Sequence, residues 1–255
     1  MNLQRSLFAL TATAVALGAA PDARAFSIGG HLNETEFHNS GHEIALSAES
    51  RIGLPGYGEF ELDIHGINDN GGFYNLDQDQ FDWVSGEAVD FSLNFNSTAQ
   101  LLTYTVGGVD LFANTVENAF SDLFVRTATR KAGSSMVVNN LKIKDGSTGG
   151  AFVDIAETAE FACTVAEECD SFWESSQYLH IDDVVGDFTL TGQSIMSWSP
   201  DNVPTRSQLA YQIKLIAGEA EAPTPTTAAI PEPTSAAAIA VIGGSLALWK
   251  RRRQA

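Results

Sequence analysis

The chain has few positive charges. It carries 14 Lys and Arg against 32 Asp and Glu, a formal net charge of −18 over 255 residues. Six of the cations lie in the first 25 and the last six residues, so residues 26–230 keep eight cations against 30 carboxylates, a formal charge of −22. A surface with this excess of carboxylates repels nucleic acid and anionic lipid headgroups, because both are negatively charged. We therefore expect no DNA or RNA partner.

The chain also lacks the short motifs of common catalytic sites. It contains no G-x-S-x-G nucleophile elbow, no P-loop, no dinucleotide-binding fingerprint and no H-E-x-x-H zinc motif. A glycosidase needs two carboxylates at a fixed separation, but in so acidic a chain such pairs arise by chance. We therefore expect a protein that is not an enzyme, with a hydrolase of the cell envelope as the least supported alternative.

The first 25 residues have the pattern of a secretory signal peptide. An apolar run, Leu7–Ala20, follows an N-terminal cation, and Ala23 and Ala25 fit the small-x-small rule of signal peptidase. The run is too short for a comfortable membrane span, which distinguishes a removable signal from an anchor. We predict that signal peptidase cuts after Ala25 and that the mature chain starts at Phe26.

The C-terminal end combines a short apolar segment with a cluster of cations. Residues 234–249 contain no charge, and they fall just short of the roughly 17 residues that a membrane-spanning helix needs. The four residues that follow are Lys250, Arg251, Arg252 and Arg253. Such a cluster stays on the cytoplasmic side, and its long side chains reach into the headgroup region. We predict a short transmembrane segment that leaves the mature domain outside.

Between the two ends, apolar and polar residues alternate in short segments. Gly, Asn, Asp and Ser separate these segments, a pattern typical of β-strands. The expected strands are 42–49, 57–65, 88–95, 101–106, 123–129, 135–143, 187–198 and 209–216. We expect 88–95 and 101–106 to form an antiparallel hairpin, and 123–129 and 135–143 to form another pair.

This alternation predicts one all-β domain over residues 26–217. The spacing of strands and turns favours an antiparallel two-sheet β-sandwich of jelly-roll-like type. A few helical residues are expected near 116–119 and 156–166. Residues 218–230, GEAEAPTPTTAAI, have no apolar face to bury and predict a flexible Pro/Thr/Ala-rich linker.

The only two cysteines are Cys163 and Cys169, in CTVAEEC. In an exported protein a lone pair this close is more often bridged than free. A redox site needs a tighter spacing and a nearby cation, whereas Glu167 and Glu168 would raise the pKa values of the thiols. We predict a structural disulfide, with free thiols as the alternative.

Two further groups contain possible metal ligands. Asp77, Asp79 and Asp82 fall within six residues in NLDQDQFDW, and calcium takes several oxygen ligands from one flexible loop. These three are calcium candidates, but the EF-hand pattern is incomplete and an ordinary solvated loop is the alternative. His38 and His42 in HNSGH are separated by turn residues, so we expect loop or strand-edge histidines there and no zinc site. We otherwise expect no cofactor.

Pro231, Glu232 and Pro233 complete a three-part C-terminus, in which a Pro-Glu-Pro triplet precedes the apolar segment and the basic end. In this order, behind a signal peptide, residues 231–253 resemble the PEP-CTERM sorting signal of Gram-negative-type bacteria. The resemblance implies a partner, an exosortase, which is a membrane cysteine protease or transpeptidase that cuts at or near the triplet. The two prolines favour an extended backbone, the conformation that a protease cleft accepts. A permanent single-pass anchor is the alternative.

Part of the domain carries a second resemblance. The segments FVRTATRKAGSSMVVNNLKI (124–143), DFTLTGQSIMSWS (187–199) and PTRSQLAYQIKLI (204–216) resemble the choice-of-anchor W domain of cyanobacterial surface proteins. The resemblance covers the second half of the domain and implies a place at the cell surface. It implies no biochemical activity and therefore no catalytic residues.

Together these features predict an exported structural or interaction protein of the cell surface or the exopolysaccharide matrix. The main alternative is a carbohydrate-binding module that acts on matrix polysaccharide, because β-sandwiches often bind glycans through exposed aromatic rings. The aromatic candidates are Trp83, Trp173, Trp198 and Tyr178, most of which would suit the core equally well.

Overall fold

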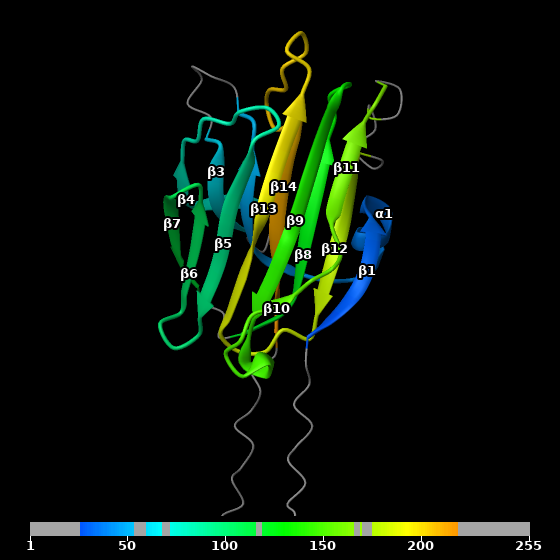
Figure 1. Ribbon diagram of the computed structural model, residues 1–255. Helices are drawn as coiled ribbons and strands as arrows, with labels where there is room; N and C mark the ends of the chain where they lie inside the picture. Colours follow the sequence, from blue (N-terminus) through cyan, green and yellow to red (C-terminus); the bar gives the residue numbers. More distant parts are fainter. Residues whose placement is uncertain are drawn as a thin grey trace, which may run out of the picture. The chain divides into compact units, whose positions relative to one another are not determined.

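The computed structural model describes residues 26–53, 60–67, 72–115, 119–165, 169 and 175–218, which form two antiparallel β-sheets (Figure 1). The protein is thus all-β, as the alternation predicted. The predicted signal peptide, with Ala23 and Ala25, lies outside the described residues. So do residues 219–255, which contain nearly all of the predicted linker and the whole predicted sorting signal. In the part of the chain that is described, no helix has the length and apolar character to cross a membrane.

Each sheet has seven strands. Sheet A contains, in spatial order, β1 (Ser27–Asn33), β12 (Ser176–Asp182), β8 (Phe120–Thr129), β14 (Leu209–Ala217), β2 (Ile44–Arg51), β3 (Leu62–Ile67) and β4 (Phe73–Asp79). Sheet B contains β10 (Val153–Asp154), β9 (Ser134–Lys144), β13 (Phe188–Trp198), β5 (Ala88–Asn96), β6 (Leu101–Val106) and β7 (Val109–Asn114), and β11 (Ala159–Cys163) also pairs with β9. The remaining elements are α1 (Glu34–Asn39) and a short 3₁₀ turn, η1 (Gly146–Thr148).

Strand pairing is nested along the chain. β2 pairs with β14, β5 with β13, β8 with β12, and β9 with β11, so that early strands meet late ones. The hairpins β3–β4 and β6–β7 extend the two sheets at one side. Seven of the twelve strand pairs join strands that are not consecutive in the chain, so among the described residues the fold depends on long-range pairing as well as on local hairpins.

One predicted strand pair is wrong. We expected 123–129 to pair with 135–143, but β8 lies in sheet A and β9 in sheet B. Both edges of β8 are filled by β12 and β14, and the turn after β8 carries the chain across to the other sheet. Alternation of apolar residues has the same form in a hairpin and in such a crossing turn, so it could not distinguish the two.

Other local predictions had mixed outcomes. The hairpin of 88–95 with 101–106 is confirmed as β5 and β6. The helical residues expected in 156–166 are wrong, because β11 forms there and pairs with β9. At the end of β11, Cys163 forms a disulfide with Cys169, as predicted. Strands β1, β4, β7, β10, β11 and β12 were not predicted.

The helix α1 forms where turn residues were expected to prevent a helix. Asn33 Oδ1 accepts a hydrogen bond from the Glu36 amide, and the Glu36 carboxylate accepts one from the Asn33 amide, which is a capping box. The helix ends before Ser40, whose hydroxyl donates to the Phe37 carbonyl. His38 is therefore helical, whereas His42 lies in the segment beyond.

The two sheets differ in what covers their outer faces. In sheet B, β5, β6 and β13 bury every second residue against the shared core, so the other face is open. In sheet A, β8 and β14 bury nearly every residue, so the outer face is covered as well. The charged side chains in the central strands of sheet A are therefore largely withdrawn from solvent, whereas the edge strand β4 is exposed.

Candidate functional site

The outer face of sheet A carries a layer of charged side chains that is withdrawn from solvent. Its members, each at most 9 % exposed, are Glu49, Asp63, His65, Asp122, Arg126 and Lys214. Arg126 on β8 is the cross-strand partner of Gln212 on β14, and Gln212 is in turn the cross-strand partner of Glu49 on β2. A buried charge is costly unless it is paired, so this layer needs both internal partners and a cover.

The helix α1 covers part of this charged layer, and its Glu34 carboxylate pairs with Arg126. Glu34 Oε2 lies 3.1 Å from Arg126 Nε and 3.1 Å from Arg126 Nη2. The same carboxylate accepts hydrogen bonds from Tyr178 Oη at 2.9 Å and from Ser176 Oγ. Burial raises the pKa of Glu34, but Arg126 and the hydrogen bonds outweigh it and hold the pKa below its ordinary value of 4.5. A charge-assisted network thus fastens α1 to sheet A.

Aromatic packing completes the attachment of α1. The Phe37 ring stacks on Tyr178 with a centroid distance of 4.3 Å, and it meets Phe124 edge-on at 5.0 Å. With Ile216 these three residues form a second, smaller apolar core on the outer face of sheet A. These apolar contacts shield the ion pair between Glu34 and Arg126 from solvent.

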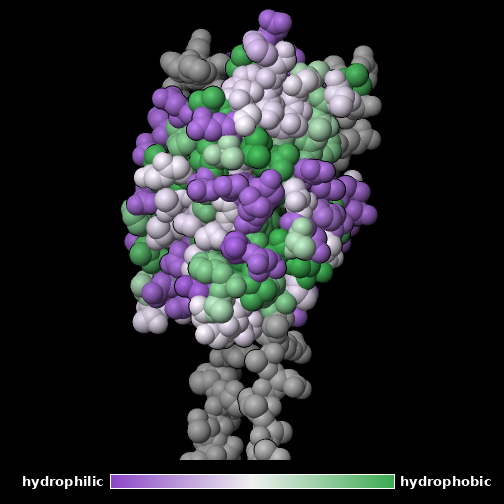
Figure 2. Space-filling model, in the orientation of Figure 1, coloured by the Kyte–Doolittle hydropathy of each residue, from purple (hydrophilic) through white to green (hydrophobic). Residues whose placement is uncertain are grey.

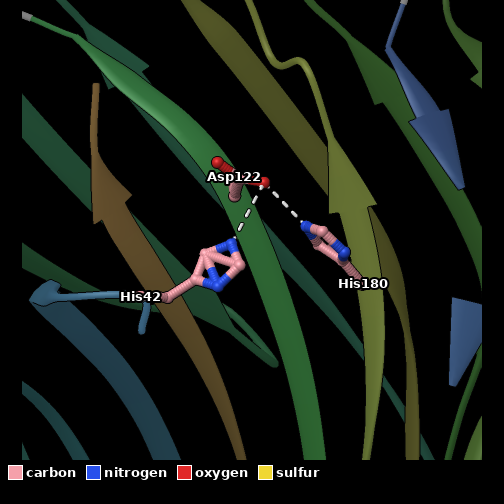
Figure 3. Close-up of side chains that lie close together, drawn as sticks. All are labelled: His42, Asp122 and His180. Atoms are coloured by element: carbon pink, nitrogen blue, oxygen red, sulfur yellow. Dashed lines mark hydrogen bonds and ion pairs between the residues drawn. The ribbon is translucent and has the colours of Figure 1, made fainter. Parts of the chain in front are cut away.

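Next to this small core, two histidines meet one carboxylate (Figure 3). Asp122 lies on β8, His180 on β12, and His42 in the segment between α1 and β2. Asp122 Oδ1 is 2.7 Å from His180 Nε2 and 3.9 Å from His42 Nε2. One ligand atom from each residue lies within 4.8 Å of the others. Two imidazoles and a carboxylate are a donor set that zinc and other divalent transition metals accept.

Each of the three residues has a further contact that fixes its orientation. His42 Nδ1 is 2.8 Å from Ser40 Oγ, which leaves Nε2 facing Asp122. Asp122 Oδ2 accepts a hydrogen bond from Ser121 Oγ at 2.5 Å. His180 is packed against Gly29 of β1, where a Cβ would overlap the imidazole. The arrangement is therefore held from several elements at once.

The ring of Phe124 supports both imidazoles. His180 stacks on it with a centroid distance of 4.2 Å, and His42 meets its edge at 5.0 Å. Burial raises the pKa of Asp122, but hydrogen bonds from His180 and Ser121 outweigh burial and lower it to about 2. Asp122 is thus a carboxylate at all ordinary pH values, fixed between two imidazoles.

The other group with metal-ligand chemistry is Glu49, Asp63 and His65. Asp63 Oδ2 is 3.0 Å from His65 Nδ1, and Glu49 is level with Asp63 on the neighbouring strand. Burial and the charge of Asp63 raise the pKa of Glu49. Burial and the nearby Arg126 lower the pKa of Lys214 to about 8, while Glu49 opposes this shift. With all three residues closed to solvent, this group is an internal ion network.

Sheet B presents a different surface, a shallow groove over β9 and β13 beside the segment after β10. Asn140 Nδ2 donates to Gln193 Oε1 at 2.7 Å, and Gln193 Nε2 donates to Asp90 Oδ1 at 2.8 Å. Lys142 Nζ forms an ion pair with Asp154 Oδ1 at 2.9 Å. Figure 2 shows hydrophilic side chains gathered across the middle of this face. Amides and carboxylates of this kind can hydrogen-bond the hydroxyls of a sugar.

The predicted calcium ligands are spread along and beyond β4, the edge strand of sheet A. Asp77 and Asp79 lie on β4 and Asp82 beyond its end. Asp77 Oδ1 accepts from the Gln78 amide and Oδ2 from the Phe112 amide of β7, so this carboxylate joins the edges of the two sheets. Among the described residues, neither group of three potential metal ligands includes any of these aspartates.

The aromatic candidates for glycan binding do not form an exposed platform among the described residues. Tyr178 is buried beneath α1, where it contacts Glu34. Trp83 and Trp198 are partly buried and pack against the main core. Trp173 lies outside the described residues.

Sequence reasoning did not find the His42, Asp122 and His180 group. Its members come from three segments that only the nested pairing brings together. One signal for the covered face was present in the sequence. Arg126 and Lys214 occupy outward positions in β8 and β14, beside several large apolar residues.

No protein-family model and no curated protein matches the chain. The resemblances to a PEP-CTERM sorting signal and to a choice-of-anchor W domain therefore rest on the residues quoted for them.

Replacing Glu34 tests the attachment of α1. Glu34→Gln leaves Arg126 buried without its anion, so we expect the free energy of unfolding at pH 7 to fall by about 3 kcal/mol. The folded-state pKa of Glu34 is below 4.5, so its contribution is complete above that pH and is lost as the pH falls through the folded-state value. Urea unfolding from pH 7 downwards should show the two proteins converging below pH 4.5.

The matched control is Glu43→Gln, at an exposed glutamate just beyond α1. Its unfolding curve should follow that of the unaltered protein at every pH. Equal destabilisation by both substitutions would contradict a specific role for Glu34.

Proposed function

We propose that the protein is an exported structural or interaction protein of the cell surface or the exopolysaccharide matrix, with a C-terminus that an exosortase processes. The observation that carries this proposal is the order of three elements, the triplet at 231–233, the apolar segment 234–249 and the basic residues 250–253. The signal-peptide pattern of residues 1–25 supplies the export that such processing requires. Because the apolar segment is short for a span, it suits a transient stop in the membrane better than a permanent anchor.

The described domain supports this role by its chemistry. The disulfide between Cys163 and Cys169 suits an oxidising compartment. The excess of carboxylates favours solubility and keeps the surface away from anionic lipids. The nested strand pairing supports a jelly-roll-like architecture, which lectin and capsid domains also use. In the proposed role, the domain presents the open face of sheet B to other matrix components and performs no catalysis.

The C-terminus of the mature protein tests this proposal. We expect mass spectrometry of the protein from its native host to find a mature chain that starts at Phe26 and ends at or near the Pro-Glu-Pro triplet. Replacing Pro231, Glu232 and Pro233 with alanine should leave the basic tail attached and hold the protein in the membrane. Replacing the linker prolines Pro223 and Pro225 with alanine should change neither outcome. A mature pool that still carries residues 250–255 would contradict the proposal.

The groove on sheet B favours a second function, binding of matrix polysaccharide. Its hydrogen-bonded series from Asn140 through Gln193 to Asp90 offers donors and acceptors in fixed positions. We expect a column of the host's polysaccharide to retain the full chain, and Gln193→Ala to reduce this retention. Gln78→Ala, at an exposed position of β4, is the matched control and should be retained normally. No retention, or equal retention of both variants, would rule out this groove as a glycan site.

A further inference from the structure

We propose that His42, Asp122 and His180 form a binding site for a divalent transition-metal ion of the zinc type. This inference goes beyond the proposed function and does not rest on it. The three residues come from different elements, yet one ligand atom of each lies within 4.8 Å of the others. Figure 3 shows both imidazoles directed towards the same carboxylate of β8.

The distances fit a metal ion with a small adjustment. Zinc bonds to nitrogen and oxygen are about 2.0–2.1 Å long, so two ligand atoms of a tetrahedral site lie about 3.3 Å apart. Asp122 Oδ1 is now 2.7 Å from His180 Nε2 and 3.9 Å from His42 Nε2. A bound ion would replace the hydrogen bond to His180 and draw His42 closer. Each of these two separations would change by about 0.6 Å. The third separation, between the two imidazoles, is at most 4.8 Å before any ion binds.

The orientation of the donors is set before any ion binds. Ser40 Oγ contacts Nδ1 of His42 and so directs Nε2 towards Asp122. Ser121 holds the second carboxylate oxygen of Asp122. Outer contacts of this kind fix the imidazole tautomer and the carboxylate position in metal sites, and their loss typically lowers metal affinity. A chance meeting of three polar residues would not require these contacts.

The site is also open to an incoming ion. Access is through His42, whose side chain is 27 % exposed, whereas the side chains of Asp122 and His180 are only 11 % and 14 % exposed. The Asp182 carboxyl forms a hydrogen bond with Asp122 beside the site. The strongly acidic surface attracts cations to this region.

The second group of potential ligands does not share these properties. Glu49, Asp63 and His65 are closed to solvent, and the ammonium group of Lys214 lies in the same buried layer. A bound cation there would compete with Lys214 for the same carboxylates. The donor set also separates the proposal from calcium binding, because calcium prefers oxygen ligands and gains little from imidazoles.

Cobalt(II) titration tests the proposal directly. The full chain, purified in mild detergent, is titrated with Co²⁺ in the presence of excess Ca²⁺, which occupies weak carboxylate sites on the surface. We expect one equivalent of Co²⁺ to give the intense visible absorption of low-coordinate, nitrogen-ligated cobalt, and Zn²⁺ to abolish it. His42→Ala and His180→Ala should each abolish the absorption. Ser40→Ala should keep the site and weaken it about tenfold, since it removes only the orienting contact.

His31→Ala is the matched control, because His31 is an exposed histidine on β1 outside this group. It should bind Co²⁺ as the unaltered protein does, and the melting curve of each variant confirms that it is folded. If the unaltered protein shows no more than the weak absorption of hydrated cobalt, the proposal is overturned and no variant is needed. Undiminished cobalt binding by His42→Ala and His180→Ala would overturn it as well, because the ion would then be held elsewhere.

Discussion

The ion pair between Glu34 and Arg126 is the contact on which the outer face of sheet A depends. Arg126 lies in the middle of a central strand and is largely shielded from water with α1 in place. Glu34 supplies the anion, and the aromatic contacts of Phe37 then close the small apolar core around the pair. Leaving either charge unpaired would be costly, so helix and sheet stabilise each other. His42 follows α1 directly in sequence and lies on the same covered face.

This constraint gives the two faces of the protein different roles. Sheet A is covered, and its charged layer is an internal network whose margin carries two histidines and a carboxylate within reach of solvent. Sheet B is open, and its outer face offers amides and carboxylates in a shallow groove. A protein of the cell surface needs a domain that stays folded without a partner and still presents a polar surface to one. The arrangement supports that role for the exported chain that we propose.

Much of the fold could be predicted from the alternation of residues, and the reasons for the failures are physical. The hairpin of β5 and β6 is local, so turn residues and alternation suffice to specify it. The turn between β8 and β9, which carries the chain from one sheet to the other, cannot be distinguished from a hairpin turn in the sequence. The strands on either side of it show alternating apolar residues, as the strands of a hairpin do. The capping box of Asn33 and Glu36 specifies the start of α1, whereas the turn residues after His38 favour a loop and determine only where the helix ends. β11 was missed because its single apolar face is short.

The candidate site could not be predicted in the same way. Asp122 and His180 are 58 residues apart and meet only because β8 and β12 pair in the nested order. His42 joins them only because α1 is fastened to the sheet. The proposed sorting signal is of the opposite kind, since its three parts are contiguous and it is inferred from their order alone. Residues that long-range strand pairing brings together leave no such local pattern in the sequence.

The most direct test of this account is a double-mutant cycle for the two charges that fasten α1. The free energies of unfolding of Glu34→Gln, Arg126→Gln and the double variant are compared with that of the unaltered protein in urea. The account predicts a coupling energy of about 2 kcal/mol or more, because each single change leaves the other charge without its counter-ion and the double change does not. Effects that add to within about 0.5 kcal/mol would contradict it, since the two charges would then act independently.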